Sequence, residues 1–231
     1  MVHIWTNGNA TYIYGFDGNG RRTNLRISND IFDPWINIPA DQTLTSNNLN
    51  QITSINGTTL TYNLNGNLLS DGTHLYTHDA VNRLVGVDGT ITYAYDGLGR
   101  RASKTVNGTV TRYVYDGARV IAEYDGAGQL LRKYIYGPGL DEPVLMQAGA
   151  TRYYYLFDSL GSVIGLTDAT GGLVEAYRYS PYGQPLLVST VGNPYMFTGR
   201  RFDSETGLYY YRARYYSPQI RRFMEPDPIG F

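Results

Sequence analysis

Two aspartates near the C-terminal end are candidates for acid–base chemistry. Asp203 lies in the turn-like stretch Asp-Ser-Glu-Thr-Gly, and Asp227 begins Asp-Pro-Ile-Gly 24 residues later. Two carboxyl groups that share one proton titrate apart, so one can act as a base while the other donates a proton. The ionised group would activate water against a scissile carbonyl, and its partner would protonate the carbonyl oxygen. The spacing therefore raises the hypothesis of an aspartic pair.

The chain between the two acids has to fold back for them to meet. A hairpin-like arrangement of the aromatic and arginine-rich residues 208–223 would do this. Pro228 and Gly230 would then bend the chain so that Phe231 turns back toward the pair. Asp-Pro and Asp-x-x-x-Gly are also common turn sequences, so two structural turn aspartates remain the alternative on spacing alone.

Arg201, close to the first acid, is the candidate cation of this site. It could hold the pair ionised or bind the scissile carbonyl. Glu205 is a possible substitute acid, although a solvated turn residue is the simpler interpretation. Other arginines compete for the cationic role, and most are expected to stack on tyrosines instead: Arg200, Arg212 and Arg214.

Other chemistry finds little support in the sequence. The chain has no cysteine and a formal net charge of −1, so it has neither thiolate metal sites nor the basic surface of a nucleic-acid-binding protein. His74 and His78 would form a metal pair on a helix, but this stretch is expected to be a strand. No apolar run approaches the roughly 18 residues of a membrane span. We expect no cofactor, no metal, no nucleic-acid partner and no membrane span.

Tyrosine is the most frequent aromatic residue of the chain, and arginine is the most frequent basic one. There are 23 tyrosines against seven phenylalanines, and 17 of the 19 basic residues are arginine. Tyrosine favours strands and carries a polar tip, and arginine stacks on it and bridges carboxylates. The composition indicates sheets that carry ladders of Tyr, Arg and Asp.

A repeat of about 20 residues sets the architecture. Each unit ends a strand with an aromatic residue followed by Asp, Gly or Ser, and the spacings are 20, 21, 21 and 22 in the series Tyr95, Tyr115, Tyr136, Phe157 and Tyr179. A constant period with turn signals means one small unit per repeat, which buries its face only against its neighbours. Almost no helix is expected.

Turn signals punctuate these units. Asn-Gly or Asp-Gly between alternating residues is a strong hairpin signal, because both turn positions need a positive φ. It occurs at Asn56-Gly57, Asp88-Gly89 and Asn107-Gly108. The repeat motif also occurs early, as a strand from Thr11, a turn and an arginine-led strand. Residues 30–50 break the pattern and are expected to form a longer connection with at most a helical turn.

These motifs resemble the bacterial Rhs family, the YD-repeat proteins. Tyr95–Arg101 and Tyr62–Leu68 are similar to its repeat units. Residues from about Tyr153 onward resemble the Rhs-associated core domain, through the series from Phe157-Asp158-Ser159-Leu160-Gly161-Ser162 to Asp227-Pro228-Ile229-Gly230. Two positions depart from the family pattern. Ser217 stands where the family usually has aspartate, and Arg221 stands where it has glycine, which would alter a turn.

The resemblance implies a fold and a function. The fold would be all-β, a YD-repeat spiral of antiparallel strands that forms part of a hollow β-shell. Residues 1–152 would be the repeat scaffold, and residues 153–231 would be the core domain that caps it. In the family, the shell encloses a variable C-terminal toxin, which aspartic autoproteolysis cuts loose after the Asp-Pro-x-Gly motif. Asp203, Asp227 and Arg201 would then be catalytic, and the cut would follow Phe231.

The resemblance also implies partners and a location. The partners would be the toxin polypeptide and further YD-repeat segments that complete the shell. The protein would be secreted or displayed on a bacterial cell surface through a specialised secretion system, since Met1–Trp5 lacks the features of a signal peptide. The alternative is a passive cell-wall or carbohydrate-binding repeat protein that uses exposed tyrosines.

Overall fold

The computed structural model describes residues 2–6, 11–16, 22–27 and 42–228. These residues are almost entirely β-structure. Their only helical element is a three-residue 3-10 turn, η2 (Phe197–Gly199). The strands pair antiparallel, mostly with the next strand along the chain. The expected all-β antiparallel fold is confirmed.

The first strands form three small sheets. One contains β1 (Val2–Thr6), β2 (Thr11–Phe16) and β3 (Arg22–Ile27), a second contains β4 (Leu44–Ser46), β5 (Ile52–Ile55) and β6 (Thr58–Thr59), and a third contains β7 (Thr61–Tyr62) and β8 (Leu68–Ser70). The early repeat motif is confirmed at the level of β2 and β3, which pair with each other. Its turn, and residues 30–41 of the expected long connection, lie outside the described residues. The described remainder of that stretch contains β4, so the expectation of an irregular connection is wrong for Leu44–Ser46, which pairs with β5.

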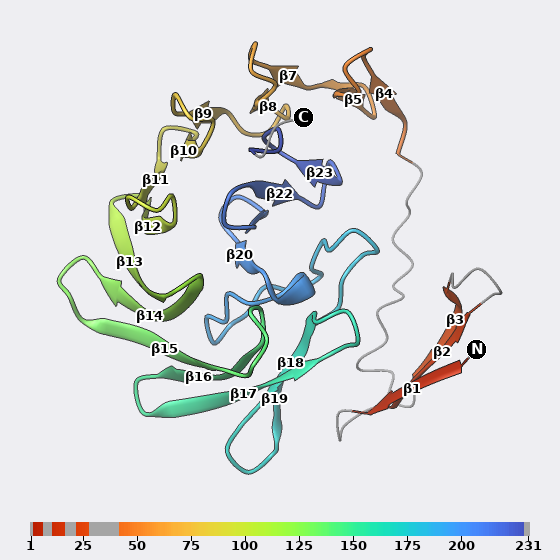
Figure 1. The fold of residues 1–231 in the computed structure, drawn as a ribbon, viewed down its shortest axis with the longest axis vertical. Helices are drawn as coiled ribbons and strands as arrows, with labels where there is room; N and C mark the ends of the chain where they lie inside the picture. Colours follow the sequence, from red (N-terminus) through yellow and green to blue (C-terminus); the bar gives the residue numbers. More distant parts are fainter. Residues whose placement is uncertain (1, 7–10, 17–21, 28–41, 229–231) are drawn as a thin grey trace.

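An eleven-stranded sheet, here called the wall, follows. Its strands are β9 (Tyr76–His78), β10 (Leu84–Val87), β11 (Ile91–Tyr95), β12 (Arg101–Val106), β13 (Thr109–Asp116), β14 (Arg119–Asp125), β15 (Leu130–Tyr136), β16 (Pro143–Ala148), β17 (Thr151–Phe157), β18 (Val163–Thr167) and β19 (Leu173–Ala176). The wall bends into an arc that stays open (Figure 1). Twist between neighbouring strands, increased at the register shifts of several pairs, accounts for the bend.

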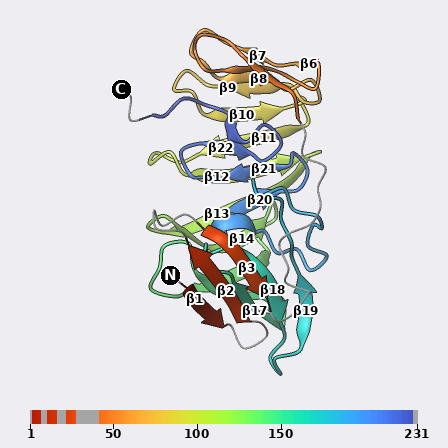
Figure 2. The ribbon, with the colours of Figure 1, turned by 90° about the vertical axis from the view of Figure 1, so that its right-hand side faces the viewer.

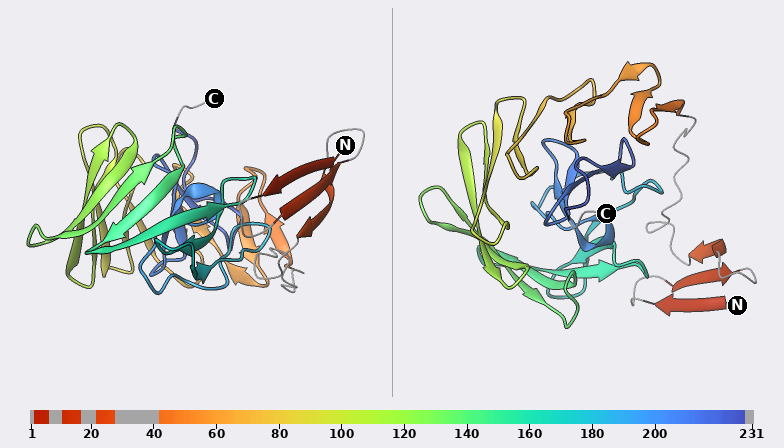
Figure 3. Two further views of the ribbon diagram at one scale, coloured as in Figure 1. Left: turned by 90° about the horizontal axis from the view of Figure 1, so that it is seen from below. Right: turned by 45° about the horizontal axis from the view of Figure 1, so that its top comes forward.

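A second sheet, here called the inner sheet, lies within this arc. It contains β20 (Arg201–Asp203), β21 (Leu208–Tyr210), β22 (Tyr215–Ser217) and β23 (Arg222–Phe223) in sequence order. It lies against the concave side of the wall both in the view from the open side of the arc (Figure 2) and in the right-hand view of Figure 3. The two hydrophobic core clusters each combine side chains of the wall and of the inner sheet. The expected concavity is therefore filled, in this chain, by its own C-terminal strands.

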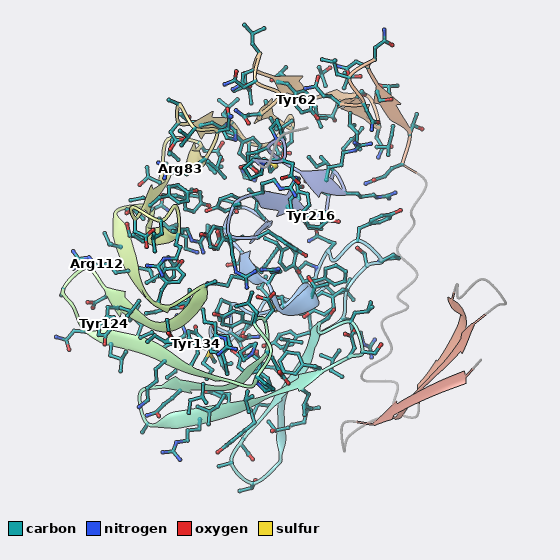
Figure 4. The ribbon with its side chains drawn as sticks, viewed as in Figure 1. Tyr62, Arg83, Arg112, Tyr124, Tyr134 and Tyr216 are labelled. Atoms are coloured by element: carbon teal, nitrogen blue, oxygen red, sulfur yellow. The ribbon has the colours of Figure 1, made fainter. Side chains whose placement is uncertain are left out.

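The two aromatic positions of the repeat, which reads Tyr-x-Tyr-Asp or a close variant, have different roles. The first tyrosine of each unit is buried on the concave side, at Tyr93, Tyr113, Tyr134, Tyr155 and Tyr177. Tyr134 points into the arc, whereas Arg112 lies on its outer side (Figure 4). The second tyrosine donates its hydroxyl to a carbonyl one repeat earlier: Tyr95 to Leu84, Tyr115 to Arg101, Tyr136 to Val120 and Tyr179 to Val163, at 2.5–2.9 Å. Four of the five repeats are thus bonded to a preceding strand, and the fifth has Phe157, which carries no hydroxyl, at this position.

The aspartate of the repeat closes the turn. In the unit at Tyr95, Asp96 Oδ1 accepts from the backbone N–H of Leu98 and of Arg100, both at 2.9 Å. Its other oxygen accepts from the Arg100 side chain, which stacks at 4.7 Å over the Tyr115 ring of the next unit. Arg83 over Tyr95 and Arg119 over Tyr136 repeat the stacking. The expected ladders of Tyr, Arg and Asp are confirmed.

The predicted hairpin turns are confirmed as well. Asn56-Gly57 and Asn107-Gly108 are two-residue loops with φ of 51° and 85°, and of 48° and 83°. Asp88-Gly89 also has positive φ at both positions, in a loop one residue longer. The expected boundary at residue 152 falls within hydrogen-bonded sheet, since β16 pairs with β17 across it. The division into scaffold and cap remains a prediction.

Tyr115→Phe should measure the strength of one link between repeats. The hydroxyl donates to the Arg101 carbonyl at 2.9 Å in a partly buried place. Its loss should lower the free energy of unfolding by about 1 kcal/mol. Urea unfolding would show the change. Tyr124→Phe, at a half-buried tyrosine outside the Tyr-x-Tyr-Asp positions, is the matched control. Equal effects of the two variants would contradict a linking role for Tyr115.

Candidate functional site

Strand β20 directs two charged side chains toward the wall. Alternation along a strand puts Arg201 and Asp203 on one face and Phe202 on the other. Both charged residues are buried. Because a buried charge is tolerated only when it is paired, each of them needs partners from the wall.

Asp203 has its partners on β12. Arg101 donates from both terminal nitrogens to the two Asp203 oxygens, and Lys104 Nζ lies 2.9 Å from Oδ1. Lys104 also lies 2.5 Å from Glu205 Oε1. Burial acts to raise the pKa of Asp203, but the charges of Arg101 and Lys104 outweigh it and hold that pKa well below its usual range. Asp203 is therefore an anion across the ordinary pH range.

Arg201 has its partner on β14. Its guanidinium donates to Glu123 Oε1, while Arg132 Nη1 lies 2.8 Å from Oε2 and the Tyr134 hydroxyl donates to Oε1 at 2.7 Å. Burial acts to raise the pKa of Glu123, but Arg201 and Arg132 lower it to about 2. The structure thus pairs Arg201 with Glu123, and the cations on Asp203 are Arg101 and Lys104.

Tyrosine rings enclose both buried guanidiniums. The Arg101 carbon lies 4.5–5.9 Å from the centroids of four rings: Tyr93, Tyr113, Tyr210 and Tyr215. The Arg201 carbon lies 4.9–5.8 Å from three: Tyr113, Tyr134 and Tyr195. Cation–π contacts are strongest where water is excluded, so these rings stabilise the two ion clusters.

A cleft of about 190 Å³ opens between the two clusters. Its charged lining comprises Lys104, Glu123, Arg132, Arg201, Asp203 and Glu205. It is the place among the described residues where several carboxylates and cations face one polar space. The cleft could hold water or a short peptide segment beside Asp203. It is therefore the candidate functional site.

Asp227 lies at the other side of the inner sheet. Its side chain is 39% exposed, and Arg214 Nη2 lies 3.0 Å from its Oδ2. β20, which ends at Asp203, and β23, which precedes Asp227, are the two edges of the sheet. Three strand spacings separate those edges, about 14 Å. The two acids thus have different ion-pair partners, and a shared proton between them remains a prediction.

The remaining predicted site residues fall at the chain end. Pro228 is exposed. Gly230 and Phe231 lie outside the described residues. Arg200 and Arg212 both pair with Asp141, and Arg200 also stacks on a tyrosine ring, as expected for most arginines.

Arg221 has a backbone conformation that suits glycine, and the alteration of this turn stays a prediction. It has a φ of 60°, the left-handed region that glycine adopts freely. Its guanidinium lies 4.3 Å from the centroid of the Tyr182 ring, a contact that glycine could not make. Ser217, the other departure, is buried, and its hydroxyl accepts from the Ile220 backbone at 3.4 Å.

Metal binding and membrane crossing find no support in the described part of the chain. No group of three or more His, Asp or Glu side chains there could hold a metal ion. His74 and His78 have separate partners, with His74 Nδ1 2.6 Å from Asp88 and His78 Nε2 3.7 Å from Glu225. No helix in those residues is long and apolar enough to cross a membrane.

The wall, the tyrosine links and the ion-paired inner sheet define a class of protein. They are the features of a YD-repeat shell, here as an open section filled by its own C-terminal strands. The chain belongs to the Teneurin YD-shell family, whose model matches residues 1–231. The resemblance to Rhs and YD-repeat proteins is thereby confirmed.

Curated relatives share most of this chain. It is 34% identical over 227 residues to the tRNA nuclease WapA of Bacillus subtilis (strain 168), which covers 93% of this chain and 9% of WapA. It is 30% identical over 237 residues to the toxin protein Tse5 of Pseudomonas aeruginosa, which covers 78% of this chain and 18% of Tse5. The chain is thus related to Rhs-type toxins and spans less than a fifth of these two.

Solved structures agree on the fold. The Photorhabdus luminescens Tc holotoxin pore matches with a TM-score of 0.63 and 21% identity, over 96% of this chain and 12% of the solved one. The crystal structure of TcdB2-TccC3 matches with a TM-score of 0.60 and 18% identity, over 96% and 12%. At such identities the likeness concerns the fold alone.

Proposed function

We propose that this chain is the C-terminal section of a YD-repeat shell that encloses a toxin polypeptide continuing beyond Phe231, and that it releases this polypeptide by aspartic self-cleavage after Phe231. The observation that carries the proposal is the buried, ion-paired Asp203 beside a polar cleft on the concave side. Relatives named as nucleases and toxins support the enclosed cargo. Further YD-repeat segments would complete the shell, because the wall is open.

In this proposal Asp203 is the base of the pair. Arg101 and Lys104 keep its carboxylate ionised, so it can accept a proton from water but does not supply one. Asp227 is then the proton donor of the pair, because a second carboxyl group brought against an ionised one takes up a proton. Arg201 acts as a positioning residue, because its pairing with Glu123 fixes the strand that carries Asp203.

Cleavage requires the C-terminal segment, residues 224–228, to move. In the described conformation Asp227 contacts Arg214. Four extended residues from Phe223 to Asp227 span about 13 Å, close to the width of the inner sheet. A path back over the sheet would bring Asp227 near Asp203 and the Phe231 carbonyl near both.

The reaction balances in two steps, each with two proton transfers. In the first step, Asp203 accepts a proton from water as the water oxygen bonds to the Phe231 carbonyl carbon, and Asp227 donates its proton to the carbonyl oxygen. In the second step, the tetrahedral carbon expels the nitrogen of the following residue, which takes the proton from Asp203. Asp227 recovers its proton from a hydroxyl of the tetrahedral carbon, and Phe231 keeps the new carboxyl group. The substrate is delivered by its own chain, so the reaction is a single turnover governed by effective concentration.

The proposal places the protein among secreted or surface-displayed bacterial toxins that use a specialised secretion system, in line with the toxin names of its relatives. The alternative, a passive carbohydrate-binding wall, would need exposed tyrosine faces. The first tyrosine of each repeat is buried, and second tyrosines such as Tyr115 are partly buried and hydrogen-bonded. An exposed tyrosine, Tyr182, stacks under Arg221. No described observation favours that alternative.

Self-cleavage is tested by extending the chain past Phe231 with a short peptide tag. The unchanged chain should release the tag and leave a fragment that ends at Phe231, identified by intact mass. Asp227→Asn should slow release by about 10²–10⁴-fold, because it removes the acid and keeps the shape. Asp227 is exposed, so this variant should fold normally.

The matched control is Asp168→Asn. Asp168 is a partly exposed turn aspartate between β18 and β19, with the same kind of turn hydrogen bonds as the other repeats. It should release the tag at the unchanged rate. Release by Asp227→Asn at that rate would refute the aspartic pair.

A further inference from the structure

A second pair of buried titratable groups lies next to the C-terminal segment. Glu225 belongs to that segment and His78 to β9, and both side chains are 2% exposed. His78 Nε2 lies 3.7 Å from Glu225 Oε1, longer than a hydrogen bond. Neither ring nitrogen of His78, nor Glu225 Oε1, has a hydrogen-bond partner in the described residues. Buried polar atoms without partners are rare and call for an explanation.

The same segment is otherwise well attached. The Met224 carbonyl accepts from the Leu68 backbone N–H at 2.9 Å, and Met224 is buried. Glu225 Oε2 accepts from the Tyr215 backbone N–H at 2.9 Å. The Pro226 ring packs closely on Gly66, because a Cβ added at Gly66 would lie only 3.2 Å from that ring. Residues 224–226 thus dock against both β8 and the inner sheet, with the histidine–glutamate pair at the centre.

The pair needs one proton to be tolerated where it is. With one proton, the two groups are either both neutral or oppositely charged. Without it, Glu225 is a lone buried carboxylate, which is costly. Burial raises the pKa of Glu225, and the contacts with His78 and the Tyr215 N–H offset this only in part. Glu225 therefore binds its proton more tightly when the segment is docked than when the segment is free.

We propose that His78 and Glu225 form a proton-sensitive latch that docks residues 224–228 against β8 and β9 and releases them as the pH rises. The sign follows from linkage. A carboxyl whose pKa is raised on docking stabilises the docked state below its ordinary value of 4.5. That contribution is lost as the pH rises through the raised pKa.

Titratable side chains next to the pair have partners of their own. Tyr95 of β11 donates its hydroxyl to the Leu84 carbonyl. The Tyr215 hydroxyl of β22 accepts from Arg101 Nη1 at 3.2 Å. Asp79, which follows His78 in the chain, pairs with Arg83 at 2.7 Å, and Asp227, two residues after Glu225, pairs with Arg214 at 3.0 Å. The pH dependence of docking is therefore assigned to His78 and Glu225.

The latch has a consequence for self-cleavage, and this consequence alone rests on the proposed function. Docked residues 224–226 hold Asp227 at the far edge of the inner sheet from Asp203. Opening the latch frees the segment to cross the sheet. Mild acid would then retain the uncleaved chain and a rise in pH would favour cleavage.

Hydrogen exchange on the chain itself tests the latch without reference to cleavage. Amides of residues 222–228 are followed by mass spectrometry from about pH 5 to about pH 8, a range that begins just above the ordinary pKa of a glutamate, and corrected for intrinsic rates. In the unchanged chain the opening constant should rise with pH, by up to about tenfold per pH unit. Glu225→Gln, which imitates the protonated carboxyl, should stay protected at every pH. His78→Gln should open further at neutral pH.

Glu142→Gln, at an exposed glutamate in the loop between β15 and β16, is the control and should keep the slope of the unchanged chain. A flat profile in the unchanged chain would overturn the latch. So would a Glu225→Gln variant that keeps the same slope, or whose segment is unprotected at every pH while the wall stays folded. Tag release is measured separately, so a failure of the latch and a failure of self-cleavage give different results.

Discussion

Asp203→Asn should lower the free energy of unfolding by about 3–5 kcal/mol. The substitution keeps the shape of the side chain but leaves Arg101, 1% exposed, without its bidentate anion. Lys104 loses one of its two carboxylates at the same time. A buried guanidinium that has lost its counter-charge is strongly destabilising, and four tyrosine rings replace only part of the attraction. Denaturant unfolding followed by tyrosine fluorescence would measure the change.

The control is a turn aspartate with a comparable arginine contact. Asp96 lies 2.7 Å from Arg100, but the side chains are 26% and 29% exposed. Solvent screens such a pair, so Asp96→Asn should cost about 1 kcal/mol or less beyond its turn hydrogen bonds. If the two variants lost the same stability, Asp203 would not be the counter-ion that holds the inner sheet.

The difference between the unchanged chain and Asp203→Asn should depend on pH. The folded pKa of Asp203 lies well below its ordinary value of 3.8. Its stabilisation is fully present above that ordinary value and is lost as the pH falls toward the folded pKa. The two unfolding curves should therefore approach each other in acid. Glu123, with a pKa of about 2 against 4.5 ordinarily, adds an acid-labile contribution of the same sign to both chains.

Local sequence signals were sufficient for the wall. A tight two-residue hairpin turn needs positive φ at both positions, and Asn-Gly at residues 56–57 and 107–108 adopts it readily, so it predicts a hairpin there. The 20-residue period reflects contacts between consecutive repeats, such as the Tyr115 hydroxyl on Arg101. Interactions over such short separations repeat in the sequence, so the meander order of the strands could be predicted.

The ion clusters could not be found in that way, because their partners are far apart. Arg101 and Asp203 are separated by 102 residues, and Arg201 and Glu123 by 78. One signal was present in the two Arg-Arg pairs, at 100–101 and 200–201. Adjacent residues on a strand face opposite sides. Arg100 and Arg200 stack on partly buried tyrosines, whereas Arg101 and Arg201 are buried in the interior.

The placement of the aspartic pair shows the limit of spacing as evidence. A separation of 24 residues is compatible with a hairpin, and residues 203–223 do fold back repeatedly. Together with the start of β20 they form four strands, however, and that number of strands was not fixed by the residue types. With four strands the two acids leave the inner sheet from opposite edges. The segment beyond Phe223 therefore decides whether they meet.

Deleting residues 200–231 should abolish the cooperative fold. The deletion removes the inner sheet and with it the core side chains Leu208, Tyr209, Tyr210, Tyr215, Ile220 and Met224, all at most 4% exposed. Each buried side chain of this size contributes about 1.5–3 kcal/mol, so the loss is on the order of 10 kcal/mol, comparable to the whole stability of a domain. The concave tyrosines and the edges of the wall would be exposed, which favours aggregation. A chain of residues 1–152 alone also lacks the inner sheet, so it should lose the cooperative fold and aggregate as well.

The matched control is a chain that ends at Pro226. It lacks Asp227 and the residues after it but keeps Met224 and Glu225, so both core clusters and both ion clusters remain. Thermal unfolding and size-exclusion chromatography should show this chain monomeric and as stable as the unchanged one to within about 1 kcal/mol. A chain ending at Gly199 that also remained monomeric and cooperatively folded would mean that the wall supports itself. The inner sheet would then be a removable insert, and its burial against the wall would need another explanation.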